Sequence, residues 1–301
     1  MRKLIIITLF LSFLLNSCHS GKDQKALSEF KVTDSALQEG VLNFPEEVLW
    51  DIVYNFSSIV EIPALIKDLG VPYHNGFLEA TNFTGSCNDN LRGAFLLGVL
   101  GLDLGYMSIY NRTSEASEYV AALRELTGSL LTSHLFDFAK IESLSASQSE
   151  PGLLVHDYMK GYNRMEQFLR EDGRRYLITA MVTGVWMEGL YLLTRSADLY
   201  PDEYIFETIG EQKIILNDLI LLLSNHQPAN PLFLSLIEDL ETLKAEFDKV
   251  EIVYEVDEPQ AVERDGMLVI VQNQRSTVNI SPEQIGSITR KMENIRNDLI
   301  L

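Results

Sequence analysis

The stretch GVLGLDLGYMSIY, residues 98–110, places three glycines and one aspartate in an otherwise apolar segment. On a helical wheel the small residues around it fall within about 80° of one another: Ala94, Gly98, Gly101, Gly105 and Ser108. Each glycine costs a helix roughly 0.5–1 kcal/mol relative to alanine, so three on one face require a compensating contact. We therefore predict a helix through residues 90–110 whose smooth face packs closely against another helix.

Glycine-rich apolar segments also occur in dinucleotide-binding loops and in membrane-spanning helices, and residues 98–110 fit each of these less well than a buried helix. A dinucleotide-binding loop needs G-x-G-x-x-G spacing at a turn from a strand into a helix, and that spacing is absent. A membrane-spanning helix needs about 20 apolar residues, and residues 93–110 and 176–194 approach that length. Each segment contains a carboxylate, Asp103 or Glu188, that costs about 2.5–3.5 kcal/mol at mid-membrane. We expect both segments to be buried central helices.

The second apolar segment, residues 174–191, repeats the pattern of small residues on one face, which includes Gly184. We predict that the two segments pack together, with Glu188 over a glycine gap where the hydroxyl of Tyr106 or Tyr191 can donate to it. Since a buried carboxylate must be hydrogen-bonded, neutralised or reached by water, two interpretations stay open. In the first, which we favour, both acids are structural groups whose hydrogen bonds are satisfied within the core. In the second, they line a ligand pocket together with nearby aromatic residues, and the candidate pocket residues are then Asp103, Tyr106, Trp186, Glu188 and Tyr191.

The N-terminus has the order of charges and apolar residues that is typical of a secretory signal. Arg2 and Lys3 precede an apolar segment, residues 4–15, that ends in Leu15-Asn16-Ser17-Cys18. This ending resembles the lipobox of bacterial lipoproteins, so we expect residues 1–17 to be cleaved and Cys18 to carry a lipid anchor. The alternative is an ordinary cleaved signal with an incidental cysteine. The polar composition of residues 18–42 predicts a flexible tether.

Beyond the tether, residues 43–249 show helical apolar spacing after helix-start signals near residues 90, 114, 151, 174, 201 and 230. The unequal spacing of these starts fits no repeat family. The apolar stripe of residues 205–223 has Gln212 as its only polar member. Residues 61–70 predict a short helix that ends at a glycine, although Lys67, Asp68, Tyr73 and His74 can instead present polar groups at a pocket mouth.

The last part of the chain, residues 250–301, changes character. β-Branched segments at 250–256 and 267–271 flank Asp265-Gly266, which predicts a small hairpin. Ser281-Pro282-Glu283-Gln284 is a capping box that predicts a final helix. The predicted fold is mainly all-α: a multi-helix bundle with two buried glycine-containing central helices, and with the hairpin and final helix packed on the same domain.

Charge and motifs exclude several functions. The chain carries 43 acidic and 24 basic residues, a formal net charge of −19, and such a field repels phosphate backbones. We therefore expect no nucleic-acid partner, and membrane attachment through the lipid rather than through a basic surface. No H-E-x-x-H, Glu-x-x-His or C-x-x-C spacing occurs, and neither a phosphate loop nor a G-x-S-x-G elbow is present. We expect no metal and no cofactor.

Four segments together resemble a family of uncharacterised helical lipoproteins from Bacteroides-type bacteria: Ile62-Pro63 with Leu65-Ile66-Lys67, residues 101–106 (GLDLGY), residues 186–191 (WMEGLY) and residues 281–284 (SPEQ). The resemblance covers most of residues 45–301. It implies a secreted, membrane-anchored, mostly helical body, and it brings no established activity and no catalytic residue.

The sequence therefore favours an outer-membrane lipoprotein that faces the periplasm or the cell surface. We expect it to bind or scaffold an unknown protein or small-molecule partner without catalysis. The alternative is a hydrolase-like enzyme that uses Asp103 and Glu188 as buried carboxylates.

Overall fold

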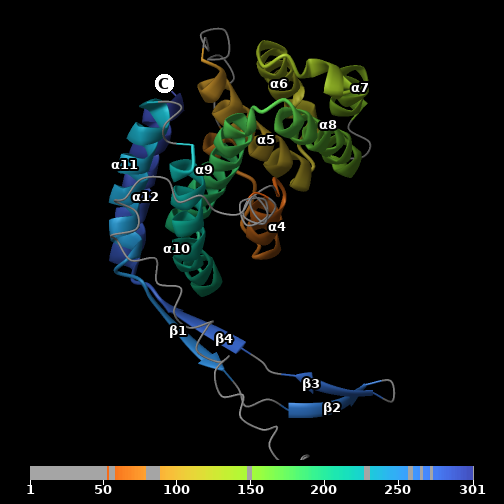
Figure 1. Cartoon of the computed structure of the whole chain (residues 1–301). Coiled ribbons are helices and arrows are strands. Elements are labelled where there is room, and N and C mark those ends of the chain that lie inside the picture. Colours follow the sequence, from red (N-terminus) through yellow and green to blue (C-terminus); the bar gives the residue numbers. More distant parts are fainter. Residues whose placement is uncertain are drawn as a thin grey trace, which may run out of the picture. The chain divides into compact units, whose positions relative to one another are not determined.

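Two long helices, α5 (Asn90–Ile109) and α9 (Arg175–Leu199), pack side by side and carry the core of the protein (Figure 1). Every residue of α5 from Gly93 to Ser108 is buried, and so is every residue of α9 from Leu177 to Leu190. Helices that are apolar on all sides must be surrounded by other elements. The prediction of two buried, glycine-containing central helices is confirmed.

The computed structural model describes residues 53, 58–78, 89–147, 151–226, 231–256, 260–264, 267–271 and 274–300. The predicted signal peptide (residues 1–17), the anchor Cys18 and the tether (residues 18–42) lie outside the described residues. The described residues belong to one unit that begins at Phe44.

The other helices cover the central pair, and most begin within three residues of the predicted positions. The bounds of these helices are α4 Glu61–Asp68, α6 Ser117–Ser129, α7 Phe138–Ser147, α8 Pro151–Glu171, α10 Glu203–Ser224, α11 Pro231–Phe247 and α12 Pro282–Ile300. α5 contacts α4, α6 and α8, and α9 contacts α4, α8, α10 and α12. α11 packs on α10 and α12, while α7 packs on α6 and α8. Short 3-10 helices lie at Asn75–Phe77, Thr113–Glu115 and Ser133–Leu135.

The helix ends agree with the sequence signals in part. At the start of α12, the Ser281 amide donates to Gln284 Oε1 over 2.7 Å and the Gln284 amide donates to Ser281 Oγ over 3.3 Å, so the predicted capping box is confirmed. At the start of α5, the capping residue is Asp89, whose carboxylate accepts from the Leu91 amide over 2.9 Å. α7 begins where no start was predicted, although Asp137 accepts there from the Lys140 amide over 3.2 Å.

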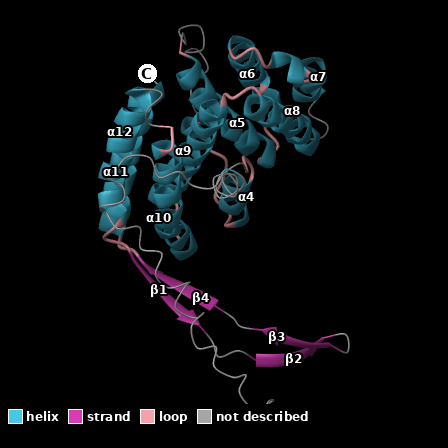
Figure 2. Ribbon diagram, viewed as in Figure 1, coloured by secondary structure: helices cyan, strands magenta, loops and turns pink. Residues whose placement is uncertain are grey.

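Within the described ranges, the strands form two antiparallel pairs, one nested inside the other in sequence (Figure 2). β2 (Gln260–Arg264) pairs with β3 (Met267–Val271), while β1 (Glu251–Val256) pairs with β4 (Gln274–Asn279). A hairpin is present as predicted, but the expected pairing of residues 250–256 with 267–271 is wrong. The partner strands β2 and β4 are rich in polar residues, so they lack the continuous apolar run by which the other two were recognised.

The two central helices approach to backbone contact at one glycine of each. A Cβ atom on Gly98 of α5 would lie 2.0 Å from the carbonyl oxygen of Met181, and a Cβ atom on Gly184 of α9 would lie 2.1 Å from the carbonyl oxygen of Phe95. Real Cβ atoms do not approach so closely. The predicted close packing of the two helices is therefore confirmed at Gly98 and Gly184.

The rest of the glycine face on α5 meets other neighbours. A Cβ atom on Gly101 would lie 2.8 Å from the hydroxyl oxygen of Tyr158 in α8, and one on Gly105 would lie 2.1 Å from the carbonyl oxygen of Ile59, just before α4. The expectation that one helix covers the whole face is wrong, because α9 crosses α5 and leaves the other two glycines to α8 and to the segment before α4.

By length and composition, α5 and α9 each resemble a membrane-spanning helix, with mean hydropathies of 1.2 and 1.4 in their most apolar windows. Those windows are 89% and 94% buried within the protein itself. Core helices of folded proteins can be equally long and apolar, so the burial of α5 and α9 agrees with their role as central helices.

We predict that Gly98→Ala and Gly184→Ala each lower the free energy of unfolding by about 3 kcal/mol or more, because the added methyl group would meet rigid backbone. Urea denaturation measures the change. Gly128→Ala in α6 is the matched control: beyond its chain neighbours and the backbone of its own helix, nothing lies within 4 Å of the added Cβ, so the change should stabilise the protein by about 0.5–1 kcal/mol. Equal effects at all three positions would contradict backbone contact between α5 and α9.

Candidate functional site

A cleft of about 300 Å³ lies between α4, α9 and α10, with Leu102 of α5 contributing to its wall. Gly189 of α9 takes part in the wall without a side chain of its own. The apolar part of the wall consists of Ile62, Leu65, Leu102, Val185, Trp186, Leu190 and Ile215. The polar part consists of Ser58, Glu61, Tyr204, Thr208, Glu211 and Gln212.

Trp186 is held in the wall by a hydrogen bond to α10. Its indole Nε1 donates to Gln212 Oε1 over 2.9 Å, and Gln212 Nε2 donates to the carbonyl oxygen of Thr208 over 3.2 Å. Trp186 and Gln212 are only 6% and 7% exposed, so this pair fixes the indole in place. The sequence marked Gln212 as the one polar residue of an apolar stripe, but nothing in the sequence identified its partner.

The solvent-facing part of the cleft is anionic. Glu61 opens α4 and Glu211 lies in the middle of α10, and both are exposed. Within the described part of the chain, neither carboxylate forms an ion pair, and no lysine or arginine lines the cleft. The cleft therefore combines an apolar interior with two carboxylates that no nearby cation neutralises.

Glu188 points away from this cleft and binds α12. Arg296 donates from Nε to Glu188 Oε2 over 2.6 Å and from Nη2 to Glu188 Oε1 over 2.8 Å. Glu188 is 0% exposed and Arg296 is 4% exposed. The guanidinium carbon lies 4.1 Å from the ring centroid of Tyr191. The expectation that a tyrosine hydroxyl is the partner of Glu188 is wrong, because α12 brings a guanidinium that satisfies both carboxylate oxygens.

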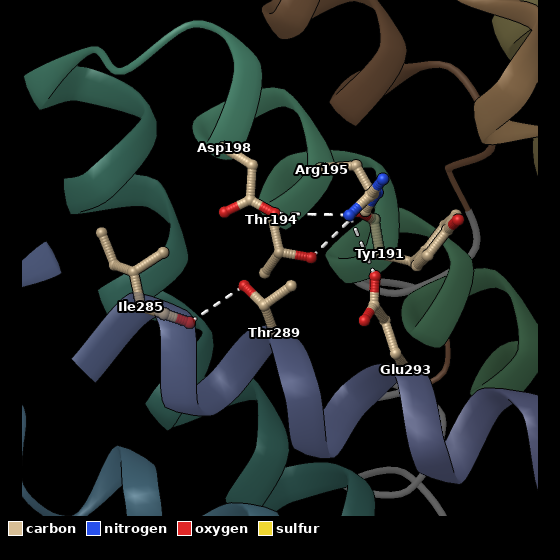
Figure 3. Close-up of polar contacts among 7 residues, drawn as sticks. All are labelled: Tyr191, Thr194, Arg195, Asp198, Ile285, Thr289 and Glu293. Carbon is tan, nitrogen blue, oxygen red and sulfur yellow. Dashed lines mark hydrogen bonds and ion pairs between the residues drawn. The ribbon is translucent and has the colours of Figure 1, made fainter. Parts of the chain in front are cut away.

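The exposed edge of the same α9–α12 contact carries a second set of polar contacts (Figure 3). Arg195 Nη1 lies 3.2 Å from Glu293 Oε1 and 3.4 Å from Asp198 Oδ2. Burial raises the pKa of the Tyr191 hydroxyl, with the Arg296 charge acting against that rise and the Glu188 charge adding to it. Tyr191 therefore belongs to a structural ion-pair cluster rather than to the cleft.

Tyr106 lies in an aromatic cluster where α5 ends. Its hydroxyl accepts a hydrogen bond from the His74 amide over 3.0 Å, and its ring centroid lies 5.3 Å from that of Tyr73 and 4.9 Å from that of Tyr110. Burial raises the pKa of the Tyr106 hydroxyl, and the nearby charge of Asp103 raises it further. Asp103 itself is 0% exposed. This cluster ties the end of α5 to the segment that follows α4.

The polar residues at the end of α4 and just after it also serve the fold. Lys67 Nζ donates to the carbonyl oxygen of Ile109 over 2.5 Å, and the Tyr73 hydroxyl donates to Glu115 Oε2 over 2.9 Å. Residues 61–68 form the short helix that the sequence predicted. The Lys67 contact holds α4 against the end of α5, the Tyr73 contact holds the segment after α4 against the 3-10 helix Thr113–Glu115, and neither side chain lines the cleft.

The structure separates the predicted site residues into three places. Trp186 lines the cleft, Glu188 and Tyr191 contact Arg296, and Asp103 and Tyr106 interact near the end of α5. No local pattern pointed to Arg296, because a single arginine on an amphipathic helix is most often a solvated surface residue. Over the described ranges, no group of three or more His, Cys, Asp or Glu residues is arranged to hold a metal ion.

We predict that Arg296→Met lowers the free energy of unfolding by about 3–5 kcal/mol, because it leaves the Glu188 carboxylate buried without its cation. The matched control is Arg195→Met, which breaks the half-exposed pair with Glu293 and should cost about 1 kcal/mol or less. Adding Glu188→Leu to Arg296→Met should restore much of the lost stability. Urea denaturation measures these changes. Equal losses of unfolding free energy in Arg296→Met and Arg195→Met would contradict the larger cost expected for breaking the buried pair.

No family model matches this chain, and neither the curated proteins nor the solved structures contain a match. The inference of function therefore rests on the geometry of the cleft and on the N-terminal sequence.

Proposed function

We propose that this chain is a non-catalytic binding lipoprotein that holds a small-molecule ligand in the cleft between α4, α9 and α10. The single observation that carries the proposal is the cleft itself, about 300 Å³ in volume and lined by apolar side chains with a few polar groups. Ligand-binding sites of proteins are concave, mostly apolar and of about this size or larger. The indole of Trp186, held by its hydrogen bond to Gln212, provides a preformed surface in the wall of the cleft.

The positions of the two buried acids favour binding over hydrolysis. A general acid or base must come within hydrogen-bond reach of its substrate. Glu188 has both oxygens engaged by Arg296, and neither Glu188 nor Asp103 is exposed or lines the cleft. We therefore prefer structural roles for these two carboxylates and propose no catalytic step.

The proposed location follows from the N-terminal sequence. The charged start, the apolar segment and Cys18 support export and lipid attachment, and residues 18–42 supply a tether that spans roughly 25–30 Å on average. We propose the outer membrane, with the body in the periplasm or at the cell surface, as the site of action. The net negative charge supports a partner other than nucleic acid.

We predict that Cys18→Ser abolishes incorporation of an alkyne-labelled fatty acid into the chain, because the thiol of Cys18 is the proposed site of acylation. Cys87→Ser is the control and should leave the incorporation unchanged. Labelling of the Cys18→Ser chain at the level of the unaltered chain would contradict the proposed anchor.

Binding in the cleft is tested with Thr208→Trp, which adds an indole to the cleft wall. Thr242→Trp is the matched control, because Thr242 lies outside the cleft and, like Thr208, bonds its hydroxyl to a carbonyl of its own helix. A library of cationic, neutral and anionic fragments is screened by ligand-observed NMR. We expect fragments that bind the unaltered chain and Thr242→Trp but not Thr208→Trp. A folded chain that binds no fragment, or binding that Thr208→Trp leaves unchanged, would contradict the proposed function.

A further inference from the structure

We propose that the ligand of the cleft is an organic cation, a protonated or quaternary amine attached to an apolar body. This inference rests on the proposed function and adds the chemical class of the ligand.

The first support is the balance of charge around the cleft. Glu61 and Glu211 contribute carboxylates to its solvent-facing part, and among the described residues neither is paired with a cation. Elsewhere in the described chain several acids have a basic partner close by: Glu246 lies 3.1 Å from Lys291, and Asp157 lies 2.6 Å from Lys140. A ligand that brings its own positive charge would neutralise the two carboxylates of the cleft.

The second support is where the basic residues of the cleft-forming helices are held. α4 contains one basic residue, Lys67, and α10 contains one, Lys213, while the two basic residues of α9 lie outside the lining of the cleft: Arg175 and Arg195. Lys67 Nζ donates to the Ile109 carbonyl over 2.5 Å, and Lys213 Nζ donates to the Val250 carbonyl over 2.7 Å. Both ammonium groups are thus bound to backbone away from the cleft, where neither residue forms part of the wall. An anionic ligand would find carboxylates there and no cation.

The third support is the chemistry of the wall behind the carboxylates. Trp186 belongs to the wall, and tryptophan is the aromatic side chain that attracts cations most strongly. Tyr204, which is 53% exposed, is a second aromatic residue of the lining. The apolar residues around them suit a hydrocarbon body. The Trp186 Nε1 and the Gln212 amide are already hydrogen-bonded within the protein, which leaves the carboxylates as the groups that select the ligand's charge.

Three probes of one shape test the proposal: 2-phenylethylamine, 2-phenylethanol and phenylacetate are cationic, neutral and anionic at neutral pH. Binding to the purified full chain labelled with 5-fluorotryptophan is followed by ¹⁹F NMR. The Trp186 resonance is assigned with Trp186→Phe. We expect the amine to shift this resonance and to bind about fivefold to tenfold more tightly than the alcohol, with the weakest binding for phenylacetate.

Charge variants locate the effect. Glu61→Gln and Glu211→Gln should each weaken binding of the amine about twofold to fivefold and leave binding of the alcohol unchanged. Glu241→Gln, an exposed acid of α11 outside the cleft, is the matched control and should change neither.

The outcomes separate the two proposals. If the alcohol or phenylacetate binds as tightly as the amine, the cation preference is wrong while the cleft remains a binding site. If none of the three probes shifts the Trp186 resonance, the proposed ligand class is overturned. The fragment screen with Thr208→Trp then decides separately whether the cleft binds any other small molecule.

Discussion

The crossing of α5 and α9 at backbone distance is the constraint on which the rest of the structure depends. Gly98 and Gly184 lie at the crossing, and each faces a carbonyl oxygen of the other helix. Because both helices are apolar on every side, neither is stable until other helices cover it. Five of the described helices do this, with α4, α6 and α8 against α5, and α4, α8, α10 and α12 against α9. The cleft lies where α4 and α10 flank α9.

The buried ion pair fixes how α12 sits on this core. A buried pair is weak support for stability, because desolvation of two charges offsets much of their attraction. It is specific, however, since an unpaired guanidinium or carboxylate in the interior would be costly in any other register of α12 on α9. Arg296 reaches Glu188 with both donors and lies over the Tyr191 ring, an arrangement that a lysine would not reproduce. Glu188 is therefore best understood as the residue that positions the final helix.

The sequence was sufficient for features that local pattern determines. The two apolar segments with small residues predicted the central pair, and Ser281 with Gln284 predicted the start of α12. Features that depend on distant parts of the chain were not predictable. Arg296 is 108 residues from Glu188, and no local signal links them. The pairing of β1 with β4 was missed because β4 is mostly polar.

The site was predicted less well than the fold for the same physical reason. The candidates were chosen as polar or aromatic residues within buried segments, and such residues most often satisfy one another inside a core, as Glu188, Tyr191 and Tyr106 do. The cleft is instead formed by residues from four helices, and only Trp186 among them was a candidate. Gln212 was visible as a polar residue in an apolar stripe, but its role depends on the approach of α10 to α9.

Native-state hydrogen exchange, resolved by residue, tests the central place of the α5–α9 pair most directly. Amides in the middle of α5 and α9 should exchange only when the whole unit unfolds, with a free energy equal to that of global unfolding, while the ends of α4, α10 and α11 open at lower free energy. If α5 or α9 opens independently, at a free energy below that of the helices that surround them, the pair is not the core of this protein.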